Sequence, residues 1–308
     1  MRKTISIVQA ILILILFALP LLATNFPKDI QRIERQSRRG DFHFIVIGDR
    51  TGAGPESWAI FDHGLRKAIS EKPAFIIFIG DIIQGGSSVP LQTQWQEAKE
   101  RLDSLDIPFF MVPGNHDIFS PQSASYWKDV IGATWFSFNF NDYHFLFLST
   151  EERAGTGRAG FGEDQLAFIQ NDLMRLEPGA SVIIFLHQPV WLYDEQLKEE
   201  WKMINAWVGE HSMTAIAGHF HVLAEKKKQN RRLLMVGPTG GRMRMGYNPE
   251  LGLMHHLTKV ACMPDSLSIT FLESNREYPE DLALKAYQRY LKSLLLLKGS
   301  AKINAEMQ

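Results

Sequence analysis

The sequence predicts an α/β fold in a single domain. Short apolar runs rich in Ile, Val and Phe alternate with segments whose apolar residues recur at three- and four-residue spacing. A hairpin signal and further short apolar runs follow in the second half, which predicts a second, partly antiparallel sheet. The chain has 308 residues, 45% of them hydrophobic, so it can build a core without disulfides.

The first half of the body supplies the alternation. The predicted strands are short and apolar: Phe42–Ile47, Phe75–Ile79, Phe109–Val112, Val182–Leu186 and Thr214–Ala217. The predicted helices have one apolar face: Glu56–Ser70, Gln92–Leu105 and Glu163–Leu176. Residues 135–147 alternate around Asn141-Asp142, which is typical of a two-residue hairpin.

The C-terminal part predicts three more strands and a helix. The strands are Leu233–Val236, Leu257–Ala261 and Leu267–Leu272. Residues 279–297 have the pattern of an amphipathic helix. We therefore expect a main domain over residues 41–275 and a C-terminal helix and tail over residues 276–308.

The N-terminus reads as a targeting segment. Arg2 and Lys3 precede an uncharged apolar run from Ile5 to Ala23. That layout is typical of a secretory signal peptide, and the run is also close to the length of a membrane anchor. Both alternatives for residues 1–23 export the remaining chain to the periplasm or the cell exterior. Residues 24–40 are polar and basic, and we expect a linker or a surface helix there.

Charge and cysteine usage exclude several classes of protein. Lys and Arg together number 33, Asp and Glu 34, and the formal net charge is −1. A dedicated duplex-binding protein would carry a basic field, so we expect no nucleic-acid partner. The single cysteine, Cys262, excludes an intramolecular disulfide and a cysteine-based zinc site.

Polar clusters follow five of the predicted strands. In open α/β sheets, ligands collect beyond the carboxyl ends of strands, so these clusters are expected to converge on one pocket. Glycine beside a ligand residue would let the backbone turn away from the strand. The clusters are Gly48-Asp49-Arg50, Gly80-Asp81, Gly114-Asn115-His116-Asp117, His187-Gln188-Pro189 and Gly218-His219-Phe220-His221.

These residue types match a site for two metal ions. Carboxylates and imidazoles suit Zn, Fe or Mn, and one aspartate can bridge two cations. Two cations lower the pKa of a water molecule between them and clamp a phosphoryl group. His116 is placed to protonate a leaving oxygen. Arg50 is a candidate for a substrate phosphate, with an outward-pointing surface arginine as the alternative.

The constellation resembles the calcineurin-like metallophosphoesterase superfamily, whose pattern runs Asp-X-His, Gly-Asp, Gly-Asn-His-Asp/Glu, His, Gly-His-X-His. The resemblance covers about residues 42–275. It implies a four-layer αββα sandwich with two central mixed β-sheets, and two metals between them. Implied roles are ligation of one metal by Asp49, Asp81 and His221, and of the other by Asp81, Asn115, His187 and His219. Asn115 and His116 would contact the substrate phosphate, and His116 would be the general acid.

Two positions depart from that pattern. Thr51 stands where the family usually has a histidine, and a hydroxyl is a weak ligand, so the first metal is expected to bind loosely or take an extra water. Gln84 stands where many phosphoprotein phosphatases have the aspartate that orients the acid histidine. A glutamine can hydrogen-bond an imidazole but cannot stabilise its charge, which disfavours a protein phosphatase.

We therefore expect an exported enzyme that hydrolyses a phosphomonoester or phosphodiester with a metal-activated hydroxide. Its partner would be a phosphate-ester small molecule or a phosphorylated substrate, with membrane contact only if the N-terminal segment is retained. One alternative is a nuclease of the same fold, although the balanced charge does not favour it. Another is a non-catalytic envelope binding protein with a degenerate site, for which Thr51 is the support.

Overall fold

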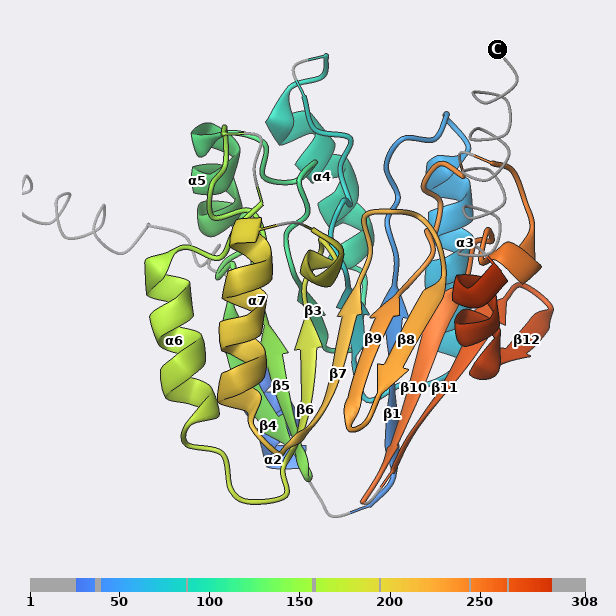
Figure 1. The fold of residues 1–308 in the computed structure, drawn as a ribbon. Coiled ribbons are helices and arrows are strands. Elements are labelled where there is room, and N and C mark those ends of the chain that lie inside the picture. Colours follow the sequence, from blue (N-terminus) through green and yellow to red (C-terminus); the bar gives the residue numbers. More distant parts are fainter. Residues whose placement is uncertain are drawn as a thin grey trace, which may run out of the picture.

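The computed structural model describes residues 26–36, 40–86, 88–156, 159–193, 195–243, 245–264 and 266–289 (Figure 1). The apolar N-terminal run lies outside the described residues, so its assignment as a signal peptide or anchor, and the export that follows from it, stay predictions. Within the described ranges, no helix combines the length and the apolar character needed to span a bilayer.

The first of two six-stranded sheets, sheet A, has the order β12-β11-β10-β1-β2-β3. Its first three strands in the chain run parallel, and its last three form an antiparallel meander that joins them through β10 beside β1. The bounds are β1 Phe42–Ile47, β2 Ile76–Phe78, β3 Phe109–Met111, β10 Leu257–Met263, β11 Ser266–Glu273 and β12 Arg276–Pro279.

The second sheet, sheet B, has the order β4-β5-β6-β7-β9-β8. Strands β5, β6, β7 and β9 are parallel, and β4 and β8 are antiparallel edges. The bounds are β4 Phe136–Phe140, β5 Tyr143–Phe147, β6 Ser181–Phe185, β7 Ser212–Ala217, β8 Ala224–Lys228 and β9 Arg231–Met235. The predicted hairpin is confirmed, and Asn141 turns it with a φ of 53°.

One sequence-based expectation about the sheets was wrong. Of the three predicted C-terminal strands, Leu233–Val236 joins the sheet of the hairpin as β9, but the other two do not, because β10 pairs with β1 and brings β11 and β12 into sheet A. An antiparallel apolar strand fits either sheet by its pattern alone, and only the pairing partner decides. The expected boundary at residue 275 falls between the paired strands β11 and β12, and the helix begins later, at residue 281.

Phenylalanine fills the space between the sheets. Phe44 and Phe75 of the sheet A side stack at 5.3 Å between ring centroids, and Phe145 of β5 meets both edge-on at 5.6 and 5.4 Å. Alternate residues of β5 point the other way, so Leu146 packs in the cluster outside sheet B. Period-two alternation thus divides each strand between two apolar layers.

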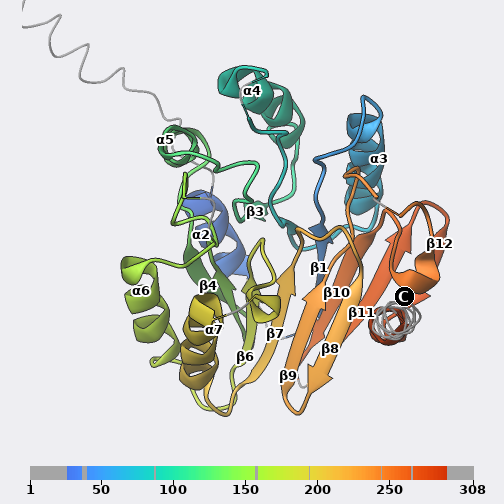
Figure 2. The ribbon, with the colours of Figure 1, turned by 45° about the horizontal axis from the view of Figure 1, so that its top comes forward.

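Helices cover the outer faces, which completes the predicted four-layer αββα sandwich (Figure 2). Phe61 of α3 stacks on Phe78 of β2 at 6.0 Å, while α6 and α7 pack on sheet B. The long helices are α3 Ser57–Ser70, α4 Leu91–Leu102, α5 Pro121–Val130, α6 Glu163–Leu173 and α7 Glu195–Val208. Two single 3₁₀ turns occupy Val190–Leu192 and Pro249–Leu251.

One helix precedes the strands of the domain in the chain and another follows them. Helix α2 covers Phe26–Gln36, within the segment predicted as a linker or surface helix, and it buries Ile33 in the larger of the two hydrophobic clusters. The predicted C-terminal helix is described over residues 281–289, and the rest of its range lies outside the described residues.

Candidate metal centre

The predicted convergence of polar strand ends is present in the structure. Asp49 follows β1, Asp81 follows β2, His187 follows β6, and His219 and His221 follow β7. Ligand-capable atoms of Asp81, His187 and His219 lie within 4.8 Å of one another, and so do those of Asp49, Asp81 and His221. Among the described residues, Asp81 is shared by these two groups.

Backbone carbonyls orient two of the imidazoles. The Nδ1 atom of His187 is 2.8 Å from the Ile79 carbonyl oxygen, which leaves Nε2 at 3.3 Å from Oδ2 of Asp81. The Nδ1 atom of His221 is 2.6 Å from the Arg242 carbonyl oxygen, and its Nε2 lies 3.7 Å from Oδ1 of Asp49. A metal-binding histidine is oriented in this way when its second nitrogen donates to a carbonyl.

The donor set fits a metal. Nε2 of His187 and Oδ1 of Asn115 are buried and have no hydrogen-bond partner among the described residues. Leaving such atoms unpaired is costly unless something else bonds to them. Both are lone-pair donors of the kind that Zn, Fe and Mn accept. The backbone also places Asn115 beside Asp81, since the amide of His116, the next residue, donates to Oδ1 of Asp81 at 2.8 Å.

The electrostatics also call for a cation. Burial disfavours a charge on His187, yet the carboxylates of Asp81 and Asp49 raise the pKa of this imidazole to about 10, so a bound metal ion would take the place of the proton that these carboxylates stabilise. Burial and the nearby His187 lower the pKa of His219 to about 3, so His219 is neutral and free to ligate. Burial raises the pKa of Asp49, an effect that a bound positive ion would oppose.

The local backbone is strained at three of these residues. Asp81, His219 and His221 have φ values of 56°, 72° and 57°, in the left-handed region that costs a non-glycine residue energy. His219 and His221 lie in the turn that follows β7. Their side chains therefore belong to the two different ligand groups and do not point to opposite faces of a strand. The amide of His219 donates to both carboxylate oxygens of Asp49, at 3.0 and 3.2 Å, and this holds the turn.

Asp117 has a role that sequence reasoning missed. It is fully buried and accepts four backbone amide bonds, from Asp81 at 2.7 Å, Gly114 at 2.9 Å, Ile82 at 3.0 Å and Ile83 at 3.2 Å. Burial and the charge of Asp81 raise the pKa of Asp117, and the amide donors oppose that rise. This carboxylate therefore ties the loop after β3 to the loop that carries Asp81.

Glycines next to ligands do more than turn the chain. Gly80, with φ of 93°, serves the turn that we expected. At Gly114 and Gly218 the reason is space: an added Cβ would lie 2.3 Å from Oδ1 of Asp81 and 2.5 Å from Oδ2 of Asp49, respectively. The absence of a side chain thus makes room for the carboxylates.

Gly218→Ala is therefore expected to lower phosphoester hydrolysis by about 100-fold, because the methyl group displaces the Asp49 carboxylate. The measurement is kcat/KM together with bound metal per chain. Gly179→Ala is the matched control, since a Cβ there meets nothing within 4 Å while φ of 88° imposes backbone strain of its own. Equal activity losses in the two variants would contradict the steric argument.

Thr51 and Gln84, the two departures from the family pattern, both bond near Asp81. The Thr51 hydroxyl donates to Oδ2 of Asp81 at 3.3 Å. The backbone carbonyl of Gln84, not its side chain, lies 2.5 Å from Nδ1 of His116, while the side-chain Oε1 accepts from the Gly52 amide at 3.0 Å. Orientation of His116 therefore does not need an aspartate at position 84.

Of the two alternatives predicted for Arg50, the outward-pointing surface arginine is wrong. It is buried, its Nε donates to the Ile82 carbonyl at 2.5 Å, and its Nη1 donates to the Ser57 hydroxyl at 2.8 Å. Its guanidinium carbon lies 4.0 Å from the centre of the Trp58 ring. Arg50 thus braces the loop that carries Asp81, and its contact with a substrate phosphate stays a prediction.

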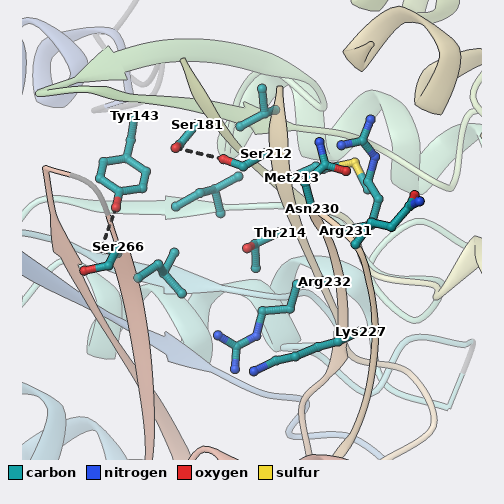
Figure 3. A pocket seen from close by; sticks show the side chains of 14 residues that line it. Tyr143, Ser181, Ser212, Met213, Thr214, Lys227, Asn230, Arg231, Arg232 and Ser266 are labelled. Carbon is teal, nitrogen blue, oxygen red and sulfur yellow. Dashed lines mark hydrogen bonds between the residues drawn. The ribbon is translucent and has the colours of Figure 1, made fainter. Parts of the chain in front are cut away.

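A separate pocket of about 240 Å³ lies at the opposite end of the strands (Figure 3). Ser181 and Ser212, the first residues of β6 and β7, line it and hydrogen-bond to each other at 2.9 Å. Three cationic side chains line it: Lys227 and Arg232 are paired with Glu280 at 2.5 and 3.5 Å, and Arg231 donates to the backbone carbonyls of His211 and Gly209. None of the predicted metal ligands lines this pocket.

Sequence comparison places the chain among known proteins. The family model described as calcineurin-like phosphoesterase matches residues 40–223, more than half of the chain. A curated relative, the probable glycerophosphodiester phosphodiesterase of Arcobacter nitrofigilis, is 26% identical over 128 residues. That match covers 39% of this chain and 44% of the relative, so it spans less than half of the relative's length.

Solved structures share the fold. The anchor protein GAP50 of the inner membrane complex of Plasmodium superposes with a TM-score of 0.57 at 14% identity, over 78% of this chain and 89% of that one. PhoD superposes with a TM-score of 0.56 at 10% identity, over 76% of this chain and 66% of that one. At such identities the similarity concerns the fold.

Proposed function

This chain belongs to the calcineurin-like phosphoesterase family of metal-dependent hydrolases, and from that premise we propose that it hydrolyses a phosphomonoester or phosphodiester at a two-metal centre. The observation that carries the proposal is the pair of ligand groups that share Asp81. Asp49, Asp81 and His221 would hold one ion, and Asp81, Asn115, His187 and His219 the other. The ions are expected to be Mn, Fe or Zn.

When bound, the two ions would activate a water molecule and neutralise charge on the phosphoryl oxygens. The protein supplies positions and a proton. The Nδ1 atom of His116 faces the Gln84 carbonyl, so Nε2 is the nitrogen available to give a proton to the leaving oxygen. Asp117 and Arg50 brace the Asp81 loop, which keeps the bridging carboxylate fixed during turnover.

The experiment compares bound metal and hydrolysis in the full chain. Purified protein is expected to hold two metal ions, to lose activity on p-nitrophenyl or bis-p-nitrophenyl phosphate after chelation, and to regain it with Mn, Zn or Fe. His219→Ala should lose metal and activity, because it removes a ligand. His63→Ala is the matched control, an exposed histidine on α3.

Three other results would contradict the proposal. Protein that binds no metal and hydrolyses neither ester with any added ion supports the non-catalytic alternative. Hydrolysis that survives complete chelation contradicts the metal mechanism. Salt-sensitive binding and cleavage of DNA, with no activity on small esters, supports the nuclease.

A further inference from the structure

A pair of aromatic rings lies beside the candidate metal centre. Phe220 stands between His219 and His221 in the sequence and is 46% exposed. Its ring lies 5.0 Å from the His219 imidazole, at 67°, and 6.4 Å from the Tyr193 ring, at 25°. Two near-parallel aromatic rings, which we call the Phe220–Tyr193 platform, therefore border one of the two ligand groups.

The position of Phe220 is tied to the ligands themselves. Its two neighbours have left-handed backbone conformations, and its own amide donates to the Gly218 carbonyl at 2.9 Å. The preceding amide is held by Asp49. Phe220 cannot turn into the core without moving His219 or His221, so the fold keeps a large apolar ring partly in water at this position.

The second ring is anchored from below. The Tyr193 hydroxyl donates to Oε1 of Gln188 at 2.6 Å, and Nε2 of Gln188 donates to Oε1 of Glu151 at 2.8 Å. The Thr150 hydroxyl donates to the same oxygen at 2.7 Å. Glu151 is buried. The burial of Tyr193 and the charge of Glu151 raise the pKa of Tyr193 to about 12, so the hydroxyl remains a donor. A buried network thus fixes an aromatic ring at the surface.

Scattered exposed apolar side chains are ordinary on protein surfaces. The Phe220–Tyr193 platform differs because a hydrogen bond to Gln188 holds the Tyr193 ring and the Phe220 ring contacts a ligand-group imidazole. A ligand whose phosphoryl group sits at the metal centre would extend past His219 toward the rings. Aromatic rings stack favourably on such a surface, whereas a short alkyl or glycerol group has no flat face to match it.

We infer that the Phe220–Tyr193 platform binds an aromatic or heteroaromatic leaving group, so that the preferred substrates are phosphate esters carrying a ring rather than esters of short alcohols. This inference rests on the proposed function, since it assumes that the phosphoryl group binds at the metal centre. The platform would select the leaving group, which the metal-ligating residues do not contact.

The test measures binding of two stable phosphonates to the metal-loaded full chain by calorimetry. Naphthylmethylphosphonate is expected to bind about 10-fold more tightly than methylphosphonate, the size of one ring-stacking contact. Phe220→Ala should reduce that preference to about 2-fold or less with bound metal unchanged, while Phe220→Tyr keeps it. Met203→Ala, an exposed apolar residue of α7, is the control and should keep the preference.

An unchanged preference in Phe220→Ala overturns the inference. So does an equal loss of affinity for both phosphonates, which would mean that Phe220 acts through the ligand histidines. Failure of the proposed function gives a different result: wild-type protein that shows the ring preference yet hydrolyses no ester retains the platform and contradicts the catalysis.

Discussion

Asp81→Ala is expected to abolish hydrolysis of a chromogenic phosphate ester at every metal concentration tested. Asp81 is shared by both ligand groups, and its removal also deprives the His116 amide and the Thr51 hydroxyl of their acceptor. No added ion replaces a bridging carboxylate, so we expect kcat/KM to fall by at least about 1,000-fold. Asn115→Ala should abolish hydrolysis in the same assay, since it removes the unpaired Oδ1.

Asp81→Asn separates charge from shape. The amide keeps the size of the side chain but lacks the second anionic oxygen, so we expect a similar loss of metal and activity. The matched control is Asp281→Asn, which makes the same change at an exposed aspartate paired with Lys285. Activity retained in either Asp81 variant, measured on folded protein, would contradict the two-metal mechanism.

Asp117→Ala should destabilise the protein by about 3–5 kcal/mol, because it leaves four backbone amides of two neighbouring loops without their acceptor. Asp117→Asn should also destabilise, since the amide nitrogen would face N–H donors instead of accepting from them. The free energy of unfolding in urea measures both effects.

Asp129→Ala, at an exposed position of α5, is the control and should change the free energy of unfolding by less than about 0.5 kcal/mol. Wild-type stability in Asp117→Ala would show that water replaces the carboxylate at these amides. A variant that is stable but inactive would show that Asp117 holds Asp81 in place for catalysis and contributes little to the stability of the fold.

Local sequence carried enough information for the strand ends and the turn between β4 and β5. Each ligand-bearing cluster directly follows an apolar run, so the same stretch of sequence predicts both the strand and the polar residues at its end. Asn141 by itself supplies the left-handed conformation of the hairpin turn. Helix α5 was missed although Ser120 and Ser123 form a capping box at its start and Pro121 occupies its first position. Helix α7 was missed as well, although Leu197, Trp201, Ile204 and Val208 follow helical spacing.

The sequence by itself determined which side chains gather at the candidate metal centre and that the fold alternates strands and helices, because both follow from residues close together in the chain. Only the tertiary structure decided that β10 pairs with β1, that Asp117 joins two loops, and that Arg50 packs on Trp58. It also showed why Gly114 and Gly218 must lack side chains. Each of these depends on atoms brought together from distant parts of the chain, and no local pattern encodes such a distance.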